Sequence, residues 1–247
     1  MNVEYMKIKR SGFVPLALGS GILAAAFPVL NMAVRPERYL NLPGSPVEIL
    51  MQANWSLMAM LNVLLVVAGA CLLYHIEYAD NGMQKMESLP VREGSLFFGK
   101  NILMALMVLA AFVIEAASLW FCAWHWFGTG AGVRMEFRGQ MVLGELGKSM
   151  GYSFLVTLPC VAVSLLLSQV CRKMWVSLGI GVICVFTATM LPTDRFLPSL
   201  FPYAMPFQVL PGTEPEQAAR YLWAAAVEAA LTGAAAFIMI RVRRWFA

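Results

Sequence analysis

Long apolar runs alternate with short polar segments along the whole chain. Six runs consist mainly of Ala, Leu, Val, Ile, Phe and Met, and charged residues flank them. Each run approaches or exceeds the roughly 20 residues that a helix needs to cross the hydrocarbon core of a bilayer. We therefore expect an all-α membrane protein with six transmembrane helices, forming a single domain over residues 1–247. The predicted spans are residues 13–34, 52–74, 101–126, 150–170, 175–191 and 218–240.

The composition supports a membrane protein and argues against a soluble one. Hydrophobic residues make up 60% of the chain and charged residues 13%, whereas a soluble domain typically carries about 25% charged residues. The first apolar run follows three basic residues, as in a signal peptide, but it extends over residues 13–34, well beyond the roughly 7–15 residues of a signal peptide's apolar region. We therefore expect it to be an uncleaved first span.

Basic residues predict the orientation. An even number of spans places both chain ends on one side. With both ends in the cytoplasm, eleven Lys and Arg residues lie inside and seven lie outside, together the 18 of the chain. Cytoplasmic loops carry the excess of such residues. The net charge of +4 is thus attributed to topology, and no nucleic-acid partner is expected.

The segment 192–217, before the last span, is apolar and broken by prolines. Repeated prolines prevent one continuous helix. Two short helical pieces that dip into the outer leaflet would bury the aromatic residues, provided that their backbone rests on protein. We expect such an outer re-entrant hairpin, and the alternative is a loop lying on the lipid surface.

Two acidic residues lie near the centres of predicted spans, Glu115 in the third and Glu228 in the sixth. An ionised group there costs about 2.5–3.5 kcal/mol on insertion scales, so such residues usually face a bundle interior or a watery cavity. One hypothesis is that both carboxyl groups line a substrate pathway or carry a proton. The other is that each is protonated or hydrogen-bonded to a neighbouring helix.

Other residues within the spans predict helix packing. Pro159 should kink the fourth span, and Gly179 and Gly181 should permit close contact between the fifth span and another helix or subunit. Polar side chains within spans usually form interhelical hydrogen bonds. The residues expected to do so are Asn54, Asn62, Ser164, Ser168 and Gln169.

Motifs for chemistry within the chain itself are missing from the sequence. The nearest string to a phosphate-binding G-x-x-x-x-G-K-[ST] loop is 147–149, but Val142 stands where its first glycine is needed. No H-E-x-x-H or G-x-S-x-G motif occurs. The five cysteines form no C-x-x-C pair, and with two histidines they suggest no metal site. We therefore expect no enzyme activity, no metal and no cofactor in this chain.

The most polar interior segment, residues 75–100, predicts a short amphipathic helix on the cytoplasmic side. Asn81 is a plausible N-cap, and Met83, Met86 and Leu89 recur at helical spacing until Pro90 ends the run. One interpretation is a helix at the lipid headgroups. The other is a docking helix that inserts adaptable methionine side chains into a partner protein.

Two local patterns in this chain resemble the permease subunits of type-2 ABC exporters, specifically those of lantibiotic protection (self-immunity) and bacitracin resistance. Before the first span, the sequence resembles their E-x-x-K-x-K-R opening, and after the second span it resembles their E-x-x-x-N…K…LP[VI]…K coupling region. One departure is Gln84, where that family often has Trp. The opening is formed by Glu4, Lys7, Lys9 and Arg10, and the coupling region by Glu77, Asn81, Lys85, Leu89, Pro90, Val91 and Lys100.

The resemblance implies a machine built from separate subunits. Two permease subunits, identical or related, would bind two copies of an ATP-binding subunit, which holds the ATP and Mg²⁺. The helix 81–89, with Met83, Lys85 and Met86, would be the coupling helix, and residues 4–10 would form an N-terminal elbow beside it. The permease would remove an amphiphilic antimicrobial peptide from the bacterial cytoplasmic membrane and so give immunity or resistance.

Two further hypotheses remain from the sequence. An ion- or proton-coupled secondary transporter would use Glu115 and Glu228 without ATP, and it predicts internal repeats. No convincing similarity between the two halves of the chain is evident. A membrane scaffold or sensor would use the cytoplasmic helix only as an adaptor.

Overall fold

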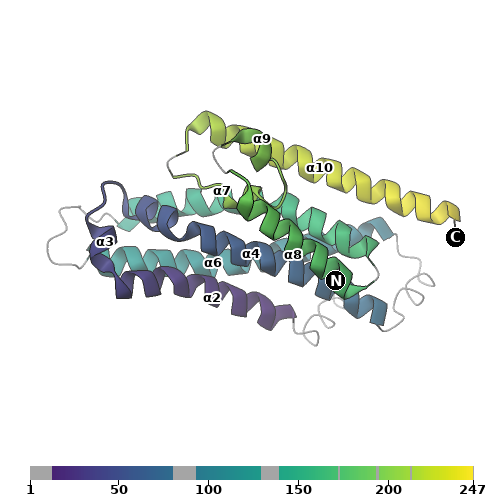
Figure 1. Ribbon diagram of the computed structural model, residues 1–247, viewed down its shortest axis with the longest axis horizontal. Coiled ribbons are helices and arrows are strands. Elements are labelled where there is room, and N and C mark those ends of the chain that lie inside the picture. The colour runs from purple at the N-terminus through teal and green to yellow at the C-terminus, as the bar shows by residue number, and fades with distance from the viewer. Residues whose placement is uncertain are drawn as a thin grey trace.

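Helices account for all regular secondary structure in the part of the chain that the structure describes (Figure 1). The structure is a computed structural model, and it describes residues 13–79, 93–128, 139–171, 173–192, 195–211 and 213–246. In chain order the elements are α2 (Phe13–Val34), α3 (Pro36–Leu40), α4 (Pro46–Ala79), α6 (Glu93–Cys122), the π-helical turn η1 (Ala123–Gly128), α7 (Gly139–Val170), α8 (Met174–Met190), α9 (Phe196–Ser199), the 3₁₀ turn η2 (Met205–Phe207) and α10 (Pro215–Phe246).

Within the described residues, five helices are long and apolar enough to cross a membrane: α2, α4, α6, α7 and α10. Together with η1, which continues α6, they contain five of the six predicted spans, so these spans are confirmed as long apolar helices. The remaining predicted span, 175–191, corresponds to α8, which is apolar but has 17 residues. At about 1.5 Å per residue it is about 25 Å long, shorter than a hydrocarbon core of about 30 Å. The total of six spans therefore stays a prediction.

Several helices continue beyond the predicted spans, and α4 shows why. Ser45 precedes α4, and its Oγ accepts a hydrogen bond from the Glu48 N–H at 3.1 Å. This is the S-x-x-E arrangement that starts a helix, and Pro46 suits the first helical position. The Ser45 hydroxyl also donates to Glu145 of α7 at 2.7 Å. A polar cap thus starts α4 before the apolar run, and the segment between α2 and α4 contains the short helix α3.

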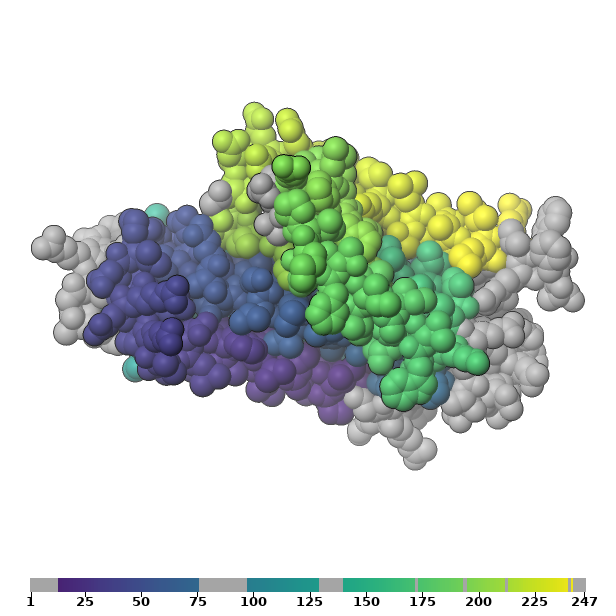
Figure 2. Space-filling model, in the orientation of Figure 1, coloured from purple at the N-terminus to yellow at the C-terminus, as the bar shows by residue number. Residues whose placement is uncertain are grey.

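The long helices lie along one axis, and the chain reverses its direction from α2 to α4, from α4 to α6 and from α6 to α7 (Figure 1). Helix α4 lies inside the bundle and contacts α2, α6, α7 and α8, whereas α10 packs mainly on α7. Helix α2 begins and α10 ends at the same end of the bundle (Figure 1). In Figure 2, α10 and α8 lie on the outside of the molecule, over the more central helices. This arrangement agrees with an even number of crossings, while the cytoplasmic orientation remains a prediction.

Close approach between α8 and α4 depends on one glycine. A Cβ atom built on Gly181 would collide with both methyl groups of Val67, whereas one built on Gly179 meets nothing within 4 Å. The prediction of close helix packing is therefore confirmed for Gly181, and its partner is a helix of the same chain.

Buried polar side chains join the helices, as expected from the sequence. The Asn31 amide of α2 donates to Asn54 Oδ1 of α4 at 2.5 Å. Ser168 of α7 and Ser177 of α8 lie 2.9 Å apart, Oγ to Oγ, and the Cys71 thiol donates to Ser177 at 3.3 Å. The interhelical roles predicted for Asn54 and Ser168 are thus confirmed. All five cysteines are free.

Candidate functional site

The proposed coupling region lies between α4 and α6. Asn81, Met83, Lys85, Met86, Leu89 and Pro90 are outside the described residues, as are Glu4, Lys7, Lys9 and Arg10 of the N-terminal elbow. Glu77 lies in the last turn of α4, but its side chain is outside the described part. The structure therefore places the two helices that flank the coupling region, and the roles of these ten residues and of Glu77 stay predictions.

The flanking helices are tied together next to that region. The Nζ atom of Lys100 in α6 lies 3.7 Å from the centroid of the Tyr74 ring in α4. Both side chains are buried, with 6% and 4% of their surface exposed. A cation over an aromatic face gains about 0.5–2 kcal/mol, more when water is excluded. Lys100, which the sequence assigned to the coupling motif, therefore links α6 to α4 in this structure.

Glu115 lies inside the bundle. Its side chain is 0% exposed, and the Asn62 amide of α4 donates to its Oε2 at 3.1 Å. The remaining oxygens, Glu115 Oε1 and Asn62 Oδ1, are buried and have no hydrogen-bond partner in this structure. Hydrogen bonding to a neighbouring helix, one of the two hypotheses for this residue, is therefore what the geometry shows.

Glu228 has a different environment. It lies on α10 and is partly exposed, and its Oε2 atom is buried without a hydrogen-bond partner. The hydroxyl of Thr232 donates to the backbone carbonyl of Glu228 at 2.7 Å and leaves the carboxyl group unused. No described contact joins Glu228 to Glu115, so the structure does not bring the two acids together.

The segment before the last helix contains the two short helical pieces expected from its prolines, α9 and η2, and it rests on protein. The indole N–H of Trp55 in α4 donates to the Pro206 carbonyl at 2.9 Å. The Ser164 hydroxyl of α7 donates to Tyr203 Oη at 3.1 Å. Tyr203 is 2% exposed, and this burial raises the pKa of its phenol, which therefore stays protonated. The position of the segment 192–217 in the outer leaflet remains a prediction.

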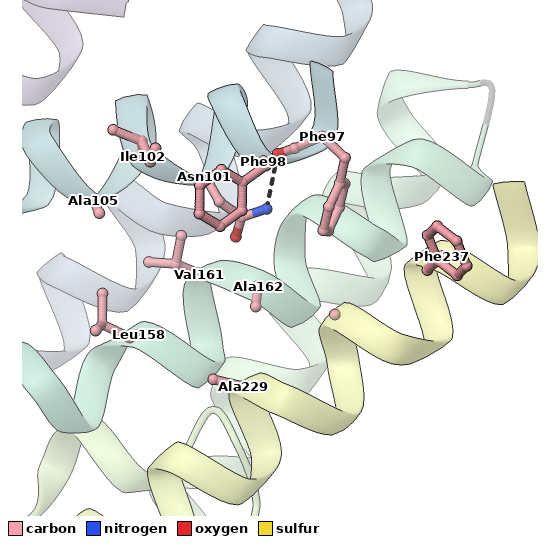
Figure 3. A pocket seen from close by; sticks show the side chains of 11 residues that line it. Phe97, Phe98, Asn101, Ile102, Ala105, Leu158, Val161, Ala162, Ala229 and Phe237 are labelled. Carbon is pink, nitrogen blue, oxygen red and sulfur yellow. Dashed lines mark hydrogen bonds between the residues drawn. The ribbon is translucent and has the colours of Figure 1, made fainter. Parts of the chain in front are cut away.

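An apolar groove lies between α6, α7 and α10 (Figure 3). Its volume is about 440 Å³. Asn101 supplies a polar side chain to the lining, and its amide donates to the Phe97 carbonyl at 3.0 Å. The lining residues are Phe97, Phe98, Asn101, Ile102, Ala105, Leu158, Val161, Ala162, Ala229, Gly233 and Phe237.

Sequence reasoning missed the partners of several site residues. Tyr74 and Lys100 lie five and seven residues from the ends of α4 and α6 that face each other, so a helical hairpin would have placed them side by side. The sequence has no comparable signal for the bond from Trp55 to Pro206 or for the groove. The two residues of that bond are 151 positions apart, so their contact depends on the tertiary arrangement. Among the described residues, no group of three or more His, Cys, Asp or Glu could hold a metal ion.

The long apolar helices define a multi-pass membrane protein. Residues 1–188 match the family described as ABC-2 family transporter protein. This match covers well over half of the chain, so the protein belongs to the ABC-2 transporter family. Membership implies that it is the membrane component of an ABC transporter and works with an ATP-binding subunit. Comparisons with curated proteins and with solved structures find no match.

Proposed function

We propose that this protein is the permease subunit of an ABC exporter that removes amphiphilic antimicrobial peptides, of the lantibiotic or bacitracin kind, from the membrane. The observation that carries the exporter part is the family match, together with the adjacent helices α4 and α6, since the residues between them, 80–92, include the proposed coupling helix. The peptide part rests on the resemblance of the two short motifs to immunity and resistance permeases. In this proposal the outer hairpin forms the gate through which the peptide leaves.

The proposed coupling step depends on residues 80–92, which connect α4 to α6. An ATP-binding subunit would hold Met83 and Met86 in a groove, and its movement would push on α4 and α6 together. The Lys100–Tyr74 contact supports this idea because it makes the ends of the two helices one unit. Two permease subunits and two ATP-binding subunits would form the working assembly, and ATP and Mg²⁺ would be held by the latter.

Of the two intramembrane acids, Glu228 is the better candidate for the substrate pathway. Glu228 is partly exposed, and its buried Oε2 atom has no hydrogen-bond partner, so this carboxyl group is free to pair with a cationic group of a peptide. Glu115 is fully buried and already bonded to Asn62. We propose a structural role for Glu115 and a substrate-attracting role for Glu228.

The test is reconstitution with the ATP-binding subunit. Met83→Asp and Met86→Asp should abolish peptide-stimulated ATP hydrolysis and resistance, because a charge in an apolar interface is desolvated without a partner. Both variants should stay in the membrane at normal levels. Met141→Asp, at an exposed position in α7, is the matched control. Peptide transport by the isolated chain without an ATP-binding subunit would instead support a secondary transporter.

A further inference from the structure

The groove between α6, α7 and α10 opens sideways toward the bilayer. Three lining residues on its rim, Phe98, Ile102 and Phe237, have 67%, 49% and 60% of their surface exposed. All lining residues belong to helices that are long and apolar enough to cross a membrane. An occupant of the groove must therefore come from the lipid phase.

The lining of the groove favours a hydrocarbon chain over an extended peptide. The groove follows α10 from Ala229 to Phe237, about 12 Å at the helical rise per residue, and has a volume of about 440 Å³. An extended peptide would leave its backbone N–H and C=O groups unpaired, because Asn101 alone in the lining offers a polar side chain, and lipid provides no substitute. A single acyl chain has no such groups to pair.

A basic residue follows the groove along α10. Ala229, Gly233 and Phe237 form an i, i+4 row on α10, and Arg241 is the next residue of that row. Arg241 is exposed and lies near the end of α10 (Pro215–Phe246). A guanidinium group can bind a phosphate with two parallel hydrogen bonds, so this position suits an anionic headgroup.

We propose that this groove is a binding site for an anionic phospholipid, with one acyl chain between α6, α7 and α10 and the phosphate at Arg241. The lining combines the aromatic rings of Phe97, Phe98 and Phe237 with the small residues Ala105, Ala162, Ala229 and Gly233. The groove begins next to Glu228 on α10, but the lipid proposal does not depend on the proposed peptide pathway.

The experiment uses the full-length protein in nanodiscs of phosphatidylglycerol and phosphatidylethanolamine. Phosphatidylglycerol carrying a photoreactive diazirine on one acyl chain is the probe, and labelled peptides are identified by mass spectrometry. We expect the label to concentrate in residues 97–105 and 229–237. Labelling spread equally over the exposed faces of α2 and α8 would overturn the proposal.

Two substitutions sharpen the test. Gly233→Leu fills the groove without collision, because a Cβ atom at Gly233 meets nothing within 4 Å, and it should reduce groove labelling several-fold. Gly19→Leu is the matched control at another open glycine and should leave labelling unchanged. Equal labelling in the two variants would contradict the proposal.

Arg241 is tested separately from the acyl chain. Arg241→Gln should remove the preference for phosphatidylglycerol over phosphatidylethanolamine in lipids that co-purify in mild detergent. Arg220→Gln, an exposed arginine near the other end of α10, is the control and should keep the preference. The lipid measurements need no ATP-binding subunit. Their outcome is therefore independent of whether the proposed export function is correct. An unchanged preference in Arg241→Gln would refute the headgroup assignment.

Discussion

Individual buried polar residues determine how the helices of this protein hold together, and Glu115 is the clearest case. Its bond to Asn62 joins α6 to α4. Glu115→Gln keeps a hydrogen-bonding amide of the same size, so folding and transport should remain normal. Glu115→Ala leaves the Asn62 amide buried without a partner, which costs about 1–3 kcal/mol. Thermal unfolding in detergent measures this difference. Loss of transport by a well-folded Glu115→Gln variant would return this residue to the substrate pathway.

Glu228 should respond in the opposite way. Glu228→Gln removes the negative charge from a partly exposed residue and should lower resistance to cationic peptides several-fold, with little change in stability. A dose–response assay with cationic and neutral peptides provides the measurement. An equal loss for both peptides would contradict the attraction of a cation.

Lys100 is the third residue whose environment in the structure leads to a prediction. Lys100→Met keeps the apolar stem but loses the cation over Tyr74, so the stability of the protein should fall by about 0.5–2 kcal/mol. Lys100→Arg retains a cation and should behave more like the wild type. Peptide-stimulated ATP hydrolysis, measured beside thermal unfolding, shows whether the contact also serves coupling. Unchanged stability in Lys100→Met would mean that the contact contributes nothing.

At the scale of elements, α8 and α4 approach each other through Gly181. Gly181→Leu forces a bulky side chain against Val67, and such overpacking typically costs about 1–3 kcal/mol. Gly179→Leu, two residues away and facing open space, should fold normally. Membrane yield and thermal unfolding of the pair make the comparison. Equal stability of the two variants would show that α8 moves away freely.

The sequence predicted elements better than it predicted their ends and partners. Apolar runs located five long helices because burial in lipid requires roughly 20 apolar residues wherever the chain crosses. The ends were missed where polar caps such as Ser45 extend a helix past its apolar run. The proline pattern predicted short pieces in 192–217, but the bond from Trp55 to Pro206 and the groove depend on which helices become neighbours, which hydrophobicity does not encode.

At the scale of the whole molecule, the arrangement makes a prediction about sidedness. If α8 crosses the membrane, a single cysteine at residue 85 and one at residue 243 should be labelled from one side, and one at residue 38 from the other. The test uses a membrane-impermeant maleimide on intact cells and on inside-out vesicles, after replacement of the five native cysteines. Labelling of residues 85 and 243 from opposite sides would mean that the chain crosses the membrane an odd number of times between them. Residue 85 labelled from outside would exclude a cytoplasmic ATPase as its partner.

The contact between Lys100 and Tyr74 has a mechanical consequence. The ammonium group over the ring favours joint movement of the facing ends of α4 and α6, so a force on residues 80–92 between them would displace both helices together. Because α4 extends for 34 residues, about 51 Å at the helical rise, a small tilt at one end becomes a larger displacement at the other. Spin labels near residues 46 and 128 would report that movement far from the place where it starts.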